Sequence, residues 1–309
     1  MQVSVVSLGT WLTYGGSAAQ DHADECTRRA HELGVNFFDT ANRYQNGQAE
    51  EVLGKALARI PRDTYLVGTK VCNRMADGPL GRGLSRKHIF GQIDHSLRRL
   101  GMDYVDLYQC HRFDPDAPLE ETARAMSDLV QMGKILYWGV SEWPVQEVRR
   151  VVRLCRSEGW AIPVSEQSQY SAIWRSVEDE KLSHCGEAGL GFLAFCPLAM
   201  GVLAGKYRAD GSASSGDRGS SADGWVMSDY LEPGVLRAVE AFRDVARAAG
   251  CSPANLALAW CLRRPEVSSV ITGASRLAQL EENVRAAELD IDTGVLQRVS
   301  DLFAPVAVG

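Results

Sequence analysis

The stretch VNFFDTANRY, residues 35–44, joins a short apolar run to a group of polar residues. Valine and phenylalanine are typical of strands, yet Asp39 follows the run at once and Tyr44 comes five residues later. Next is "AEEVLGKALARI" (49–60), whose apolar residues recur at three- and four-residue spacing, as in a helix. We interpret the stretch as a buried strand that ends in polar residues and leads into a helix.

The same strand-then-helix pattern occurs eight times. Helix candidates such as "SRKHIFGQIDHSLRRL" and "VQEVRRVVRLCRSEG" separate the β-rich runs. The runs are 3–9, 35–40, 65–70, 104–111, 135–141, 162–167, 190–198 and 268–274. Eight βα units predict a (β/α)8 TIM barrel, formed as a single domain by residues 1–309. The alternative, a doubly wound sheet, would normally carry G-x-G-x-x-G after its first strand, and "LGTWLTYGG" does not match.

The composition excludes several classes of protein. A net charge of -6 gives no basic field for a phosphate backbone, so we expect no nucleic-acid partner. No apolar run approaches the roughly 20 residues that span a bilayer, so we expect no membrane insertion. The eight cysteines contain no C-x-x-C pair, and we interpret them as reduced thiols of a cytoplasmic protein.

Polar residues end several of the runs. In TIM barrels the active site is built at the carboxyl ends of the strands. These ends, and the loop after the second strand, carry Asp39, Tyr44, Lys70, His111, Ser141, Glu166 and Gln167. We therefore expect these side chains to converge on one mouth of the barrel.

The chemistry of four of these residues is compatible with proton transfer. A buried Lys70 needs a partner, and Asp39 on the adjacent run is the nearest candidate. An ammonium beside Tyr44 would lower the pKa of its phenol and make it a better proton donor, while His111 would orient a carbonyl. Taken singly, each residue has a structural explanation as an ion pair or a rim side chain. Their joint placement favours a catalytic site. "DHADEC" (21–26) matches no metal motif, and we assign no metal.

Longer motifs carry a resemblance to a known family. They include "FFDTANRY", "GTKV", "SLRRLGMDYVDLYQCHRFDPDAPLEET", "WGVSEW", "EQSQY", "CPLAMGVLAGKY" and "VITGASRLAQLEEN". Over nearly its whole length the chain resembles the aldo-keto reductase superfamily, in the branch of the voltage-gated potassium-channel beta subunits and their bacterial relatives. The resemblance implies a catalytic tetrad of Asp39, Tyr44, Lys70 and His111, with Tyr44 as the general acid.

The resemblance also implies a nicotinamide cofactor, NADPH, lying across the mouth. Ser141 and Gln167 would hold its carboxamide, and Tyr170 would stack on the nicotinamide ring. Ser275, as the N-cap of the last barrel helix, and Arg276 would suit a 2′-phosphate; the alternative is a plain capped helix with Arg276 in solvent. The remaining implied cofactor contacts are Trp11, Pro197, Leu198, Gly201, Lys206, Gly273, Gln279, Glu282 and Asn283. The segment 209–224 is expected to be a mobile loop after strand seven, which either closes over the cofactor or stays a surface loop.

The implied reaction is reduction of an aldehyde or ketone to an alcohol. Candidates for the substrate pocket are Trp11, Asn73, Trp143 and Trp174, although each tryptophan has scaffold packing as its alternative. The alternative function is a cofactor-binding regulatory or channel-type beta subunit with little turnover. His111 argues against it, because such subunits often have asparagine there, and so does the lack of an N-terminal extension.

The resemblance carries two further expectations. Relatives often assemble, so we expect a homo-oligomer. Relatives also usually have a hairpin ahead of the first barrel strand, whereas "VSVVSLGTW" begins almost at Met1. We therefore expect either an upstream segment of the natural protein or another element, such as "VLQRVSDLF" (295–303), to cover the barrel floor.

Overall fold

The computed structural model describes residues 1–16, 19–205, 207 and 230–307. Eight parallel strands form a closed barrel in chain order, each paired with the next, and β8 pairs with β1. The strands are β1 (Val6–Gly9), β2 (Phe37–Asp39), β3 (Leu66–Val71), β4 (Val105–Cys110), β5 (Ile135–Ser141), β6 (Ser165–Gln169), β7 (Gly191–Phe195) and β8 (Val267–Thr272). The predicted (β/α)8 barrel is confirmed. Lys206 and the segment 209–224 lie outside the described residues.

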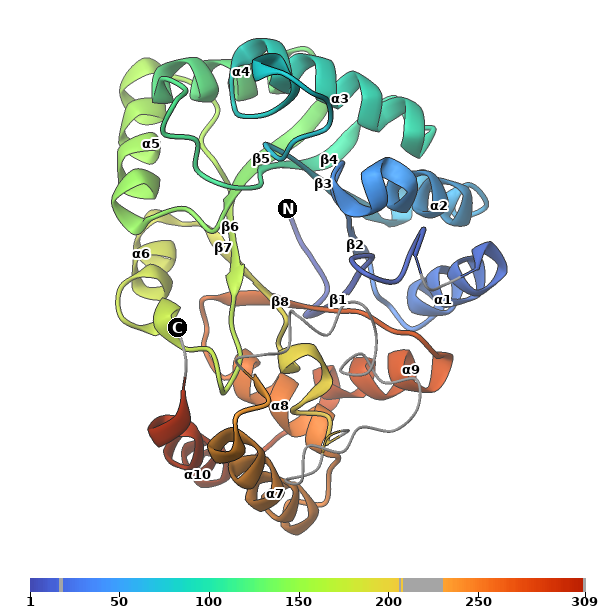
Figure 1. The fold of residues 1–309 in the computed structure, drawn as a ribbon, viewed down its shortest axis with the longest axis vertical. Helices are drawn as coiled ribbons and strands as arrows, with labels where there is room; N and C mark the ends of the chain where they lie inside the picture. The colour runs from blue at the N-terminus through green and yellow to red at the C-terminus, as the bar shows by residue number, and fades with distance from the viewer. Residues whose placement is uncertain (17–18, 206, 208–229, 308–309) are drawn as a thin grey trace.

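Helices surround the strands, as Figure 1 shows. They are α1 (Gln20–Glu32), α2 (Gln48–Leu57), α3 (Arg86–Leu100), α4 (Leu119–Gln131), α5 (Val145–Glu158), α6 (Lys181–Ala188), α7 (Pro233–Ala248), α8 (Pro253–Leu262), α9 (Leu277–Arg285) and α10 (Thr293–Phe303). Two short 3₁₀ turns, η1 (Tyr44–Gly47) and η4 (Ser176–Glu178), follow β2 and β6. Among the described residues, no helix combines the length and apolar character needed to cross a membrane.

The strand ends differ from the predicted ones where backbone geometry intervenes. The run 190–198 was expected to be one strand, but β7 ends at Phe195. Cys196 follows with a φ of 53°, in the left-handed region that no strand residue adopts. The first strand also begins later than expected, at Val6. Periodicity therefore located all eight strands but not their limits.

The inside of the barrel changes from apolar to polar along the strands. Phe37, Leu107, Leu193 and Ile271 form a cluster separate from the main core, because alternate residues of a strand point inward while the others pack on the helices. Two residues past Phe37 on β2, the inward position is Asp39. The apolar cluster thus lies directly below a polar mouth.

One glycine makes room for this interior. A Cβ at Gly68 of β3 would lie 2.7 Å from the Phe37 ring and 3.8 Å from an Asp39 carboxylate oxygen. Contacts under 3.0 Å are not found for real Cβ atoms, so the large Phe37 side chain requires glycine on the neighbouring strand. Sequence and packing agree here, because a side chain at Gly68 would displace Phe37 of the apolar cluster, on which the polar mouth rests.

The C-terminal helix packs on the side of the barrel. In Figure 1, α10 lies beside α7 in the outer ring, and Ser300 of α10 accepts a hydrogen bond from Trp260 Nε1 of α8 at 2.9 Å. The expectation that residues 295–303 cover the barrel floor is therefore wrong. The apolar face of α10 buries Val299 and Phe303 among the helices instead.

We expect Gly54→Ala to destabilise the fold. A Cβ at Gly54 of α2 would clash with the Leu100 carbonyl oxygen, and backbone cannot move aside as a side chain can. Overpacking of this kind costs about 1–3 kcal/mol, more than the gain from alanine's better helix propensity. Chemical denaturation would measure the change. The control is Gly91→Ala in α3, where nothing lies within 4 Å of the new Cβ and a small stabilisation is expected.

Candidate active site

A buried ion pair lies at the centre of the mouth. Lys70 Nζ donates to both carboxylate oxygens of Asp39, at 2.7 and 2.6 Å, and to the Thr40 carbonyl at 2.9 Å. Lys70 is 0% exposed and Asp39 is 3% exposed. The side chains meet because β2 and β3 are parallel neighbours whose carboxyl ends lie together.

Tyr44 begins the turn η1 and completes the group. Its hydroxyl lies 3.3 Å from Lys70 Nζ. Burial raises the pKa of Tyr44 well above its ordinary value, and the negative charge of Asp39 adds to this effect. The expectation that Lys70 lowers this pKa is wrong for the free protein, because Asp39 compensates the ammonium and the loss of water dominates. Tyr44 therefore keeps its proton at neutral pH and has one to donate.

His111 follows β4 and faces Tyr44. The two rings meet edge to face with centroids 5.8 Å apart, and Asn73 Nδ2 lies 3.2 Å from His111 Nδ1. Burial lowers the pKa of His111 well below its ordinary value, and the positive charges of Lys70 and Arg112 act in the same direction. His111 is therefore neutral at physiological pH.

Other predicted residues surround this group. Gln167 donates through Nε2 to Asp39 at 3.0 Å, and Ser141 is its partner in the β5–β6 register. The ring of Trp11, partly exposed, lies 6.4 Å from that of Tyr44. Trp11, Ser141 and Gln167 thus lie near the four central side chains, from three different strands or strand ends.

Tyr170 is not at the mouth. It follows the inward-facing Gln169 and so turns outward from the barrel, where it is 0% exposed. Its ring packs against Trp260 and its hydroxyl donates to Glu178 at 2.6 Å. The expectation that Tyr170 stacks on a cofactor is therefore wrong, because no face of the ring is accessible.

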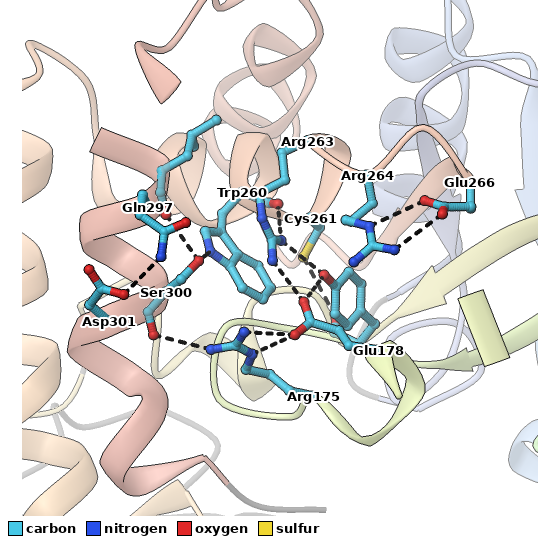
Figure 2. Close-up of polar contacts among 12 residues, drawn as sticks. Arg175, Glu178, Trp260, Cys261, Arg263, Arg264, Glu266, Gln297, Ser300 and Asp301 are labelled. Carbon is cyan, nitrogen blue, oxygen red and sulfur yellow. Dashed lines mark hydrogen bonds and ion pairs between the residues drawn. The ribbon is translucent and has the colours of Figure 1, made fainter. Parts of the chain in front are cut away.

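Figure 2 shows a polar network around Glu178, outside the barrel. Tyr170 joins this network through its hydroxyl, which contacts Glu178 and Arg263. Glu178 accepts from Arg175 at 2.7 Å and from Arg263 at 2.7 Å, and the guanidinium of Arg263 lies 3.6 Å from the Trp260 ring centroid. Arg175 also donates to the Ser300 carbonyl of α10 at 3.1 Å. The network ties the segment after β6 to α8 and α10, which is a structural role.

Phe195 is the aromatic residue that our sequence reasoning missed. It is the last residue of β7, is partly exposed, and lies two positions past the inward-facing Leu193. Residues two apart on a strand share a face, so Phe195 points toward the inside of the mouth. The alternation in "GFLAF" could have revealed this, had the strand end been known.

The start of α9 differs from its predicted form. The N-cap is Arg276, with extended backbone and no side-chain capping bond, so the expectation that Ser275 is the N-cap is wrong. Ser275 instead uses its backbone N–H and its hydroxyl to donate to Gln279 Oε1, at 3.1 and 3.0 Å. Ser275 and Arg276 are both exposed.

The remaining expected cofactor positions follow β7 and β8 or lie on α9. Asn283 is 3% exposed, whereas Glu282 is partly exposed and its carbonyl accepts from Asn255 Nδ2 at 2.6 Å. Gly273, after β8, is exposed. After β7, Pro197 is buried, and Leu198 and Gly201 are partly exposed.

The tryptophans expected in the substrate pocket differ from one another. Trp143 is 1% exposed and packs edge to face on Phe113 at 5.1 Å. It also lines a hollow beside η4, together with Pro144 and Lys181, so its place in a substrate pocket stays a prediction. Trp174 and Asn73 are partly exposed, as a lining residue must be.

Glu50 supports the site from behind the barrel, and no sequence pattern pointed to it. This fully buried carboxylate of α2 accepts from Thr69 of β3 at 2.5 Å and from Arg99 of α3 at 2.7 Å. Thr69 directly precedes Lys70, and α2 directly follows the turn that carries Tyr44. Glu50 therefore links β3, which carries Lys70, to α2, which follows the turn that carries Tyr44. Within the described ranges, no group of three or more His, Cys, Asp or Glu residues could hold a metal.

Comparison with known proteins places the chain in a family. The profile of the Aldo/keto reductase family matches residues 5–303. A protein of Schizosaccharomyces pombe named "Putative voltage-gated potassium channel subunit beta" is 37% identical, covering 100% of this chain and 92% of that protein. One of Arabidopsis thaliana named "Probable voltage-gated potassium channel subunit beta" is 38% identical over 94% of this chain and 89% of its own. The "L-glyceraldehyde 3-phosphate reductase" of Escherichia coli is 36% identical over 93% and 84%. The chain therefore belongs to the aldo/keto reductase family of oxidoreductases.

Proposed function

We propose that this protein reduces an aldehyde or ketone to an alcohol, with NADPH as the reductant and Tyr44 as the general acid. The observation that carries the proposal is the position of Tyr44, whose hydroxyl lies 3.3 Å from Lys70 Nζ and whose ring meets His111 edge to face. Burial raises the pKa of Tyr44 and lowers the pKa of His111, which favours a protonated phenol beside a neutral imidazole. A proton donor, a fixed positive charge and a neutral hydrogen-bonding ring together suit an oxygen that gains negative charge.

The residues at the mouth fit a nicotinamide. Gln167 donates one amide N–H to Asp39, so its amide oxygen can still accept a hydrogen bond from a carboxamide. Ser141, its partner in the β5–β6 register, lies beside it as a second contact for that carboxamide. Phe195, in place of Tyr170, offers an inward-facing aromatic surface for the ring. Bound NADPH supplies the hydride that reduces the carbonyl carbon.

The start of α9 suits the other end of the cofactor. Arg276 and the Ser275 hydroxyl are exposed beside free amides of a helix N-terminus, a combination that favours a phosphate. This supports NADPH over NADH. Gln279, Glu282 and Asn283 would then contact the adenosine, and Gly273, Pro197, Leu198, Gly201 and Lys206 the pyrophosphate.

Each central side chain has a separate task in this mechanism. Tyr44 gives its proton to the carbonyl oxygen as negative charge develops there. Lys70 then stabilises the phenolate left on Tyr44, because its ammonium is the nearest cation and Asp39 keeps it in place. His111 donates a hydrogen bond to the same oxygen and fixes the direction of the carbonyl.

A second candidate function comes from the relatives named as channel beta subunits, which are 37% and 38% identical to this chain. In that case the protein binds NADPH and regulates a partner with little turnover.

The reductase relative makes L-glyceraldehyde 3-phosphate a natural first substrate to test, together with aromatic aldehydes. The expected homo-oligomer, cytoplasmic location and single-domain organisation stay predictions.

We expect Tyr44→Phe to lower kcat by about 10²- to 10⁴-fold, the usual contribution of a general acid, with NADPH binding retained. The assay is NADPH oxidation with a panel of aldehydes, and fluorescence titration measures cofactor binding. The matched control is Tyr170→Phe, which also removes one buried hydroxyl. It should lower stability by about 1.5–3 kcal/mol, because this hydroxyl bonds to the charged Glu178 and Arg263, but leave kcat unchanged. An active Tyr44→Phe protein would refute the mechanism, and a wild type that binds NADPH without turnover would favour the regulatory function.

The pH dependence of reduction should be flat near neutrality. The pKa of Tyr44 is raised and that of His111 is lowered, so Tyr44 stays protonated and His111 stays neutral. We expect kcat/KM to be constant from about pH 6.5 through neutrality, because neither His111 nor Tyr44 changes its protonation state there. On the alkaline side kcat/KM should fall as Lys70, whose pKa is lowered by burial, loses its proton. A limb with a midpoint near pH 7 would show that one of the two groups titrates there.

Replacing Arg276 should change the choice of cofactor. Loss of a charge-assisted hydrogen bond costs about 1.5–3 kcal/mol, or roughly 10- to 100-fold in affinity. We therefore expect Arg276→Ala to weaken NADPH binding by that factor and to leave NADH binding unchanged. Arg285→Ala, an exposed arginine at the other end of α9, is the control. Equal loss for both cofactors would contradict a 2′-phosphate contact.

A further inference from the structure

The two nitrogens of His111 have different surroundings. Asn73 Nδ2 lies 3.2 Å from Nδ1. An amide nitrogen is a donor only, so Nδ1 must accept, and the single proton of the neutral ring then resides on Nε2. Asn73 thus decides which nitrogen carries the proton.

The charged groups around the ring do not compete for this role. The charges that act on His111 are Lys70 on β3 and Arg112, the next residue in the chain. Both are donors, so neither offers an acceptor to a proton on Nδ1. Arg112 also donates through Nη1 to the His111 carbonyl at 2.6 Å, which restrains the backbone, and Tyr44 faces the ring edge to face.

The chain places Asn73 for this contact by an unusual turn. Asn73 comes three residues after Lys70, just past the end of β3, and Cys72 between them has a φ of 151°. Residues with a Cβ rarely adopt such values, and strained backbone of this kind clusters at functional sites. The same strand end therefore delivers both Lys70 and the partner of His111.

We propose that Asn73 is a positioning residue that fixes His111 as the Nε2–H tautomer, so that Nε2–H, and not a lone pair, points to the substrate oxygen. The catalytic half of this inference rests on the proposed reductase function. With the opposite tautomer, Nε2 would present a lone pair to the oxygen that accepts the proton of Tyr44, and the two would repel. Asn73 is thus assigned to His111 rather than to general lining of the substrate pocket.

The tautomer is measured directly by ¹⁵N NMR of the imidazoles in the full chain without cofactor, with His111→Gln identifying the resonances. We expect an unprotonated Nδ1 and a protonated Nε2 in the wild type at neutral pH. Asn73→Asp should protonate Nδ1, because a carboxylate only accepts. Asn46→Asp is the matched control, since it adds the same charge at an exposed position of η1 and should leave the tautomer unchanged. A wild-type Nδ1–H, or an Asn73→Asp protein whose Nδ1 stays unprotonated, would overturn the proposal.

Kinetics test the catalytic half. Loss of one correctly placed donor to an oxyanion lowers kcat by about 10²- to 10³-fold, and we expect a fall of this size for Asn73→Asp with little change in the KM for NADPH. The variant should also gain a pH-dependent limb near neutrality, because a carboxylate beside Nδ1 stabilises the imidazolium. A changed tautomer with unchanged kcat would overturn the catalytic half. If the wild type reduces no carbonyl, the reductase function fails, and NMR still decides the tautomer.

Discussion

The fold and the site both depend on the ion pair between Lys70 and Asp39. An ammonium that is 0% exposed is tolerated only with its charge compensated and its three protons accepted, and two carboxylate oxygens and one carbonyl do this. Removal of one partner from such a pair typically costs about 3–5 kcal/mol. The pair thus requires β2 and β3 to end together, and it places Tyr44 and Gln167, which contact it.

Support for the site comes from outside the barrel as well. Glu50 joins Thr69 and Arg99 behind β3, and Glu178 joins Arg175 and Arg263 beyond β6. Glu50 pairs with one guanidinium and Glu178 with two, and the planar donors of these groups restrain direction as well as distance. These networks lie between strands and helices, so the segments that follow β2 and β6 are held from both sides.

The sequence was sufficient for the barrel and for the ion pair, but not for local geometry. Strand periodicity located all eight strands, and a buried lysine pointed to Asp39. Alternation along β6 turns Tyr170 outward, whereas β7 ends at the inward-facing Phe195, just before the left-handed Cys196. Sequence reasoning took Tyr170 from the family resemblance and missed Phe195. It also gave the wrong direction for the pKa of Tyr44, since the balance of burial against two opposite charges requires coordinates.

The apolar cluster under the mouth has an electrostatic consequence. Phe37, Leu107, Leu193 and Ile271 fill the barrel below the ion pair, so water cannot solvate the central charges from that side. A medium of low dielectric constant makes the attraction between Lys70 and any anion formed above it stronger than in bulk water. Fixed protein dipoles, rather than reorienting water, then stabilise the charge that develops when Tyr44 gives up its proton. The reorganisation energy of this proton transfer is therefore low.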